Sequence, residues 1–370
     1  MGERMKVIPI DKLQPVLVTG ATGYVAGWIV KRLLDAGVTV HAAVREPRRE
    51  DKVAHLKALA ADAPGKLHLF AADLLQDGSY AAAMAGCGIV FHTASPFTSQ
   101  FADPQKDLVD PAVQGTRNVL DEAKRSDSVR RVVLTSSCAA IYCDAIDCAR
   151  APGGRLDETV WNTTASLDYQ PYSYSKTAAE RSAWDIARAQ SRWQLVVLNP
   201  SLVVGPALQA RPTSESFRIV QSMGDGTLRM GAPRVGFGAV DVRDLADAHL
   251  AAAFLPHASG RNIVSAHETD LLAMARTLLP RFGKAYPIPR RAMPKWKTWL
   301  FGPLLDRTIT RRFVTRNVDV PWRADNSKAI RELGLAYRPL EQSMQDMFEQ
   351  MIGSGMLPQR RPLQDPRRVT

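Results

Sequence analysis

Short, almost entirely apolar runs alternate with amphipathic stretches through the first two hundred residues. Residues 24–36 have apolar side chains at the spacing of one helix face, and Gly37 follows as a stop. Strands are expected in six apolar runs, at residues 16–18, 38–44, 67–70, 89–91, 132–134 and 195–198. Runs of this kind are typical of strands buried on both faces of a parallel sheet. The alternation predicts an α/β fold built on a doubly wound Rossmann sheet.

The pattern loosens after Pro200, where prolines interrupt shorter segments. We expect a dinucleotide-binding Rossmann domain over residues 12–205, completed by about 236–265. A smaller, mainly C-terminal substrate domain is expected over 206–235 and 266–352.

Two terminal segments fall outside these domains, and one basic segment lies within the expected substrate domain. Residues 1–11 and 356–370 are expected to be flexible termini. Residues 290–314 are basic and contain Trp296 and Trp299. We interpret them as a helical lid with solvated charges and packed aromatic rings, in preference to a membrane-surface helix.

Composition narrows the class of protein. The 370 residues are 45% hydrophobic and 23% charged, which is typical of a globular chain, and the formal net charge is +11. No apolar run approaches the roughly 18 residues of a membrane span, and the N-terminus does not resemble a signal peptide. A cytoplasmic protein without membrane or nucleic-acid partners is expected, because no recognition motif accompanies the charge. Cys138, Cys143 and Cys148 lack a CxxC pair or a nearby histidine, so no metal site is expected.

A glycine-rich turn lies between the first strand and the first helix, in the sequence TGATGYVA over residues 19–26. Gly20 permits a tight turn, and Gly23 allows the backbone to approach a pyrophosphate at the helix N-terminus. Ala26 stands where a third small residue lets the helix pack on the sheet. In this context the pattern indicates a dinucleotide site.

The second strand ends in Val44-Arg45 and is followed by further basic residues, among them Lys52. A carboxylate at this position would hold the ribose 2′-hydroxyl of NAD, whereas a guanidinium pairs with the 2′-phosphate of NADP. NADP(H) is therefore favoured over NAD(H). Surface solvation of these charges is the alternative.

Other candidates follow the third and fourth strands. Asp73 could meet the adenine amine, although a helix N-cap explains it equally well. The stretch from His92 to Pro96 should border the cofactor, and His92 itself is interpreted as a core residue.

Ser137, Tyr172 and Lys176 form the sharpest constellation. Tyr172 and Lys176 are four residues apart and share a helix face. A lysine ammonium favours the phenolate form of a nearby phenol, so Tyr172 can exchange a proton with a carbonyl oxygen. Ser137, just after the fifth strand, can hydrogen-bond that oxygen. Tyr174 is not a candidate for the proton donor, because it lies two residues before Lys176 and so on a different side of the helix. Ser136 is not a candidate for the hydrogen-bond donor, because neighbouring residues in a strand point to opposite faces and Ser137 takes that role.

With these motifs the chain resembles the extended short-chain dehydrogenase/reductases, in particular the group of dihydroflavonol 4-reductases and cinnamoyl-CoA reductases. The resemblance rests on segments that include TGATGYVAG (19–27), GCGIVFHTASP (86–96), LTSSCAA (134–140) and YSYSKTAAE (172–180). Asn199 departs from the arginine usual before Pro200, and Ala26 departs from the usual third glycine. The resemblance implies a catalytic triad of Ser137, Tyr172 and Lys176. It implies cofactor contacts from Gly20, Gly23, Tyr24, Val25, Arg45, Lys52, Asp73, Leu74, Thr93, Tyr172, Lys176, Pro200 and Ser201.

The sequence therefore predicts an NADPH-dependent aldehyde or ketone reductase, or the same enzyme run as an alcohol dehydrogenase. Its partner is a small carbonyl or alcohol substrate, and the protein is expected as a monomer or homodimer. The alternatives are an NAD-dependent sugar-nucleotide epimerase or dehydratase, a 3-beta-hydroxysteroid dehydrogenase-like enzyme, and a regulatory protein that senses NADP without chemistry. A sensor would not need the Ser/Tyr/Lys set.

Overall fold

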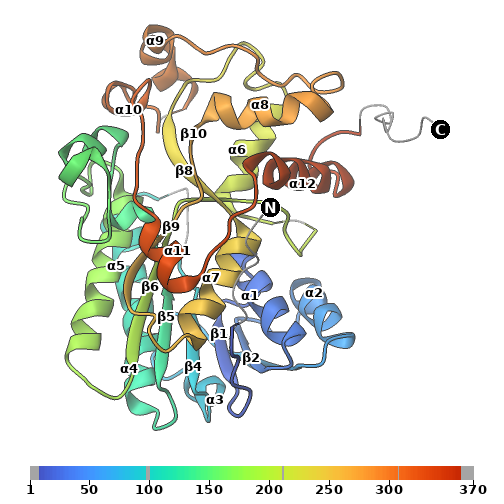
Figure 1. Cartoon of the computed structure of the whole chain (residues 1–370), viewed down its shortest axis with the longest axis vertical. Helices are drawn as coiled ribbons and strands as arrows, with labels where there is room; N and C mark the ends of the chain where they lie inside the picture. Colours follow the sequence, from blue (N-terminus) through green and yellow to red (C-terminus); the bar gives the residue numbers. More distant parts are fainter. Residues whose placement is uncertain (1–7, 97–100, 211, 307, 360–370) are drawn as a thin grey trace.

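The computed structural model describes residues 8–96, 101–210, 212–306 and 308–359. Its main sheet is parallel throughout, in the strand order β3-β2-β1-β4-β5-β6-β9 (Figure 1). The strands are β1 (Val16–Thr19), β2 (Thr39–Val44), β3 (Lys66–Ala71), β4 (Ile89–His92), β5 (Arg131–Thr135), β6 (Gln194–Pro200) and β9 (Gly260–Val264). The six expected strands are confirmed, and the seventh comes from the segment expected to complete the sheet.

Helices cover both faces of this sheet. On one face lie α1 (Tyr24–Asp35), α2 (Glu50–Ala61) and α7 (Val242–Phe254), whose apolar residues share one buried cluster with β1 and β2. On the other lie α3 (Ala81–Met84), α4 (Asp110–Arg125) and α5 (Pro171–Arg188), which enclose a second cluster. The helix expected over 24–36 is α1. The doubly wound architecture follows from this layering, because β1 and β4 are neighbours although β2 and β3 separate them along the chain.

A smaller sheet lies beyond the carboxyl ends of the main strands. It contains β7 (Leu202–Val204), β8 (Gly236–Asp241) and β10 (His267–Asp270), with β8 in the centre. Helices α6 (Glu215–Gly224), α8 (Leu271–Phe282) and α12 (Leu340–Gly353) pack around it in a separate apolar cluster. β7 and β8 lie inside the ranges 12–205 and 236–265 that were assigned to the Rossmann domain, and the domain limits stay a prediction.

Three further helices complete the C-terminal third: α9 (Lys295–Leu305), α10 (Arg311–Asn317) and α11 (Ser327–Leu333). The expectation of packed aromatic rings in 290–314 is wrong, because Trp296 is 62% exposed and Trp299 is 40% exposed.

The chain ends are packed further than expected where the structure describes them. Ile8 and Ile10 lie against the core, and Leu357 is buried. Residues 1–7 and 360–370 of the expected flexible termini lie outside the described residues. In the described part of the chain, no helix is long and apolar enough to cross a membrane.

Candidate active site

The glycine turn after β1 is shaped for close approach to a ligand. Gly20 has φ +61°, and a Cβ there would lie 3.1 Å from the Cα of Ala94 in the loop after β4. Gly23 is the N-cap of α1, and its amide donates to the Gly20 carbonyl at 2.8 Å. Helix α1 begins with neither a side-chain cap nor an acidic residue in its first turn. Its first amide groups can therefore bind an anion such as a pyrophosphate.

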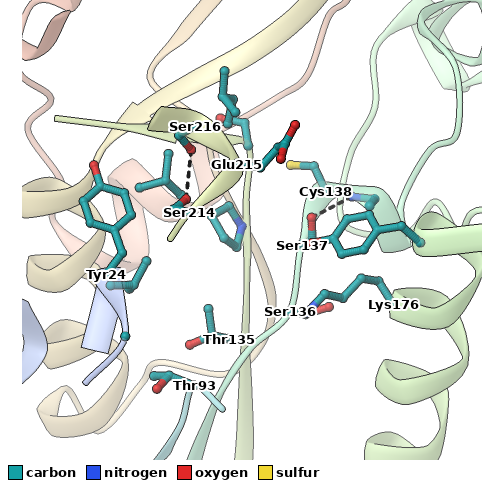
Figure 2. A pocket seen from close by; sticks show the side chains of 18 of the residues that line it. Tyr24, Thr93, Thr135, Ser136, Ser137, Cys138, Lys176, Ser214, Glu215 and Ser216 are labelled. Atoms are coloured by element: carbon teal, nitrogen blue, oxygen red, sulfur yellow. Dashed lines mark hydrogen bonds between the residues drawn. The ribbon is translucent and has the colours of Figure 1, made fainter. Parts of the chain in front are cut away.

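A cavity of about 620 Å³ opens beside this turn (Figure 2). It lies at the carboxyl ends of β1, β4, β5 and β6, which is where ligands bind in open α/β sheets. Ten of the predicted site residues line it, namely Gly20, Gly23, Tyr24, Val25, Thr93, Ser137, Tyr172, Lys176, Pro200 and Ser201. The fold thus brings together residues that are up to 181 positions apart in the sequence, from Gly20 to Ser201.

Ser137, Tyr172 and Lys176 share the wall of this cavity. Ser137 lies two residues after the end of β5 and caps the short helix Cys138–Ala140, where its Oγ accepts from the Ala139 amide at 3.1 Å. Tyr172 and Lys176 lie in the first turns of α5, and the Lys176 Nζ is 5.7 Å from the centre of the Tyr172 ring. Figure 2 shows Ser137 and Lys176 on the same side of the cavity. A hydroxyl, a phenol and an ammonium thus line the same cavity.

The loop after β4 supplies further polar contacts. Lys176 donates from Nζ to the Ser95 Oγ at 2.9 Å, and the Thr93 amide donates to the Thr19 Oγ1 at 3.1 Å. His92 is buried, and its Nδ1 lies 3.0 Å from the Thr19 Oγ1. Burial, helped by the charge of Lys176, lowers the pKa of His92 to about 3. His92 is therefore neutral at working pH, as expected of a core residue.

Tyr24 contributes to the site differently from the other lining residues. Its hydroxyl donates to the Gly205 carbonyl at 2.6 Å, and its ring packs edge-on against Phe217 at 5.2 Å between centres. Burial raises the pKa of the phenol well above its usual value. The side chain joins α1 to the smaller domain, so only the backbone of Tyr24 is placed for a phosphate.

Four predicted cofactor residues lie outside the cavity lining. Arg45 and Lys52 are exposed after β2, and no carboxylate among the described residues lies within ion-pair distance of either. Their neighbour Arg49 instead pairs with Glu46 and Asp51. Unpaired cations at the end of β2 suit the 2′-phosphate end of an extended dinucleotide.

Asp73 and Leu74, the other two, have local structural roles. The exposed Asp73 carboxylate accepts from the Leu75 amide at 2.9 Å, which makes it a turn-capping residue. Leu74 lies over Gly115 of α4, where a Cβ would come within 2.5 Å of the Leu74 side chain. These contacts hold the loop after β3 in place beside the candidate adenine end.

A buried ionic network behind Ser137 was not predicted from the sequence. The Glu180 carboxylate of α5 accepts from the Arg261 Nε at 2.6 Å, the Asn199 Nδ2 at 2.7 Å and the Ser136 Oγ at 2.5 Å. Asn199 also donates to the Ser137 carbonyl at 3.1 Å. Glu180 is 1% exposed and Arg261 is 7% exposed. The network thus ties β5, β6, β9 and α5 together next to Ser137.

Arg261 makes further contacts that fix the position of this network. Its Nη1 donates to the carbonyls of Glu158 and Val160, and its guanidinium lies 4.0 Å from the Trp161 ring centre. Glu180 and Arg261 are 81 positions apart, so no short sequence motif contains both. The one signal in the sequence is a charged residue within a segment expected to be buried, which needs a partner of opposite charge.

The far end of the cavity was also missed by sequence reasoning. It is lined by Tyr142 and Cys143 after β5 and by Ser214 and Glu215 at the start of α6. Ser201 contributes an Oγ that is buried without a hydrogen-bond partner in the described part of the chain. An orphaned hydroxyl in a cavity wall fits a polar ligand group. The cavity wall therefore offers an unpaired hydroxyl to a polar ligand.

These features define the class of protein. A Rossmann sheet, a glycine turn at an uncapped helix N-terminus and a Ser/Tyr/Lys set in one cavity are the parts of an extended short-chain dehydrogenase/reductase.

Comparison with known proteins assigns the family. Residues 16–264 match the family described as NAD dependent epimerase/dehydratase, and the chain belongs to that family. It is 36% identical to the cinnamoyl-CoA reductase CAD2 of Medicago truncatula over 342 residues, which cover 91% of this chain and 95% of that protein. It is 38% identical to a putative anthocyanidin reductase of Ginkgo biloba over 288 residues, covering 75% and 82%. These relatives place it in the dihydroflavonol and cinnamoyl-CoA reductase-like group of NAD(P)-dependent oxidoreductases.

Solved structures agree with this assignment. The yeast methylglyoxal/isovaleraldehyde reductase Gre2, solved with NADPH, superposes with a TM-score of 0.71 at 26% identity. The superposition covers 92% of this chain and 99% of that one. The similarity therefore extends through the smaller domain as well as the Rossmann sheet.

Proposed function

We propose that this protein is an NADPH-dependent reductase of small aldehydes or ketones, able to run in reverse as an alcohol dehydrogenase. The observation that carries the proposal is that Ser137, Tyr172 and Lys176 line the same cavity as the glycine turn of α1. The reductase relatives and the NADPH-bound fold neighbour support it.

The residues of this chain would hold the dinucleotide in two places. The α1 amides after Gly23 would bind the pyrophosphate, and Arg45 with Lys52 would bind the 2′-phosphate. Pro200 and Ser201 would lie beside the nicotinamide, with the unpaired Ser201 Oγ available to it. When bound, the reduced nicotinamide supplies a hydride to the carbonyl carbon.

Tyr172 and Ser137 act on the carbonyl oxygen. The Ser137 hydroxyl donates a hydrogen bond to that oxygen and orients the carbonyl. Tyr172 transfers its phenolic proton to the oxygen as negative charge develops there. The Lys176 ammonium, 5.7 Å from the Tyr172 ring centre, stabilises the phenolate that remains until it is reprotonated from solvent.

The proposal is tested by following absorbance of the reduced nicotinamide with the purified protein. NADPH and NADH are each combined with a panel of aromatic aldehydes, aliphatic ketones and flavanonols. The proposal expects net oxidation of NADPH, faster than that of NADH, with at least one carbonyl compound. Absence of turnover across the panel, with NAD tightly bound after purification, would instead identify an epimerase or dehydratase.

A further inference from the structure

Helix α9 exposes an apolar stripe on its outer face. Trp296, Leu300 and Leu304 follow one another at four-residue spacing and are 62%, 44% and 82% exposed. Trp299 and Phe301 flank this stripe and are 40% and 49% exposed. A surface helix ordinarily turns its polar face to water, so α9 has the reverse arrangement.

The inner face of α9 is already packed. Thr298 and Gly302 are buried, and a Cβ on Gly302 would lie 2.7 Å from Ile309. Lys295 donates from its Nζ to the Val318 carbonyl at 2.7 Å at the end of α10. Helix α9 is therefore packed against the protein through its inner face, and its apolar outer face is left without a partner among the described residues.

Positive charge is concentrated in the segment that contains this stripe. Residues 284–316 contain nine lysines and arginines but a single acidic residue, Asp306. This segment therefore carries eight of the eleven net positive charges of the chain. Arg290, Arg291 and Lys297 are exposed. Two cations lie over the exposed indoles, with Lys297 at 5.4 Å from Trp296 and Arg311 at 4.5 Å from Trp299.

We propose that the α9 face, defined as the exposed side of residues 295–304 with its surrounding cations, docks on an anionic lipid surface. Indole rings beside lysine and arginine are suited to the membrane interface, where apolar side chains enter the acyl boundary and cations meet lipid phosphates. A second copy of this chain would bring like charges together, so charge complementarity favours the lipid.

The shape of the molecule fits this docking. Helices α9 and α10 form one end of the long axis, at the top of Figure 1. A helix of 11 residues is about 16 Å long, well short of a bilayer, so it would lie in the interface plane.

A charged residue that follows the docking face interacts with α6, whose first residue lines the cavity. Asp306, just after α9, contributes to the electrostatic field at Arg218 of α6, whose pKa is raised mainly by its hydrogen bond to Glu215. Glu215 lines the cavity.

Vesicle sedimentation with the full chain tests the proposal. Vesicles of phosphatidylcholine alone are compared with vesicles that also contain phosphatidylserine, at low and high salt. The chain is expected to bind the anionic vesicles at low salt and to dissociate as salt rises. Trp296→Ser combined with Leu304→Ser should weaken this binding about tenfold or more. Ile330→Ser, which removes a 44% exposed side chain from α11, is the matched control and should bind as the unmodified chain does.

Two results would overturn the proposal. One is equal binding of the double variant and the unmodified chain to anionic vesicles, or no binding by either. The other is self-association of the unmodified chain in sedimentation velocity that the double variant abolishes, since the occupant would then be a second copy. NADPH binding by the double variant, measured by fluorescence, verifies that it is folded.

Discussion

We expect the buried carboxylate of Glu180 to position Ser137 through Asn199, and Glu180→Gln tests this role. The substitution keeps the shape but replaces one acceptor oxygen with an NH2 group. That group would face either the Arg261 Nε, now 2.6 Å from Oε1, or the donors Ser136 and Asn199 on Oε2. A donor would then oppose a donor, and the 7% exposed Arg261 would lose its counter-charge.

The expected cost is large because the remaining charge stays buried. Removal of one partner of a buried ion pair destabilises a protein by about 3–5 kcal/mol. Since Asn199 also donates to the Ser137 carbonyl at 3.1 Å, the Ser137 loop should shift as well. A displacement of this kind can reduce turnover by roughly 10- to 100-fold.

Urea unfolding gives the free energy, and steady-state NADPH oxidation gives kcat and KM. Asp185→Asn is the matched control, because it breaks a pair with Arg188 in the same helix in which both side chains are 70% exposed. It should leave stability and turnover unchanged. The double variant Glu180→Gln/Arg261→Gln should recover part of the lost stability. Wild-type stability and kcat in Glu180→Gln would refute the positioning role.

Three other predictions concern the cofactor, pH and packing. Arg45→Ala should raise the KM for NADPH about tenfold or more and leave that for NADH unchanged, because only the phosphate contact is lost. Burial lowers the pKa of His249 from 6.5 to about 4, so the unfolded chain takes up a proton that the folded chain excludes. Stability should fall by on the order of 3 kcal/mol as pH drops across that range, and His249→Gln should remove this part of the dependence in urea titrations. Gly238→Ala would place a Cβ 2.5 Å from the buried Trp322 ring, and should cost about 1–3 kcal/mol in the same unfolding assay. A wild-type midpoint for this variant would show that the neighbouring ring can move.

The main sheet could be predicted because its strands are apolar at almost every position. Their order also places the glycine turn and Ser137 at one edge, so much of the cavity followed from connectivity alone. The four-residue spacing of Tyr172 and Lys176 likewise predicted that both side chains lie on one face of α5.

The smaller sheet could not be predicted in this way. β7 has only three residues, and β8 includes two glycines, so neither carries a strong strand pattern. Their pairing depends on tertiary contacts. The Glu180–Arg261 ion pair could not be predicted either, because no sequence motif connects the two residues. Residues 290–314 were interpreted as a lid with packed aromatic rings because they are basic and contain two tryptophans, yet composition cannot tell a packed ring from an exposed one.

The central claim is that Tyr172 supplies the proton during carbonyl reduction, and Tyr172→Phe tests it most directly. Tyr174→Phe is the control, because Tyr174 is also 37% exposed, lies two residues away on α5 and does not line the cavity. With a carbonyl substrate found in the panel, Tyr172→Phe should reduce kcat by roughly 100-fold or more and retain NADPH binding, whereas Tyr174→Phe should keep wild-type turnover. A folded Tyr172→Phe variant with most of the wild-type hydride-transfer rate would contradict the account.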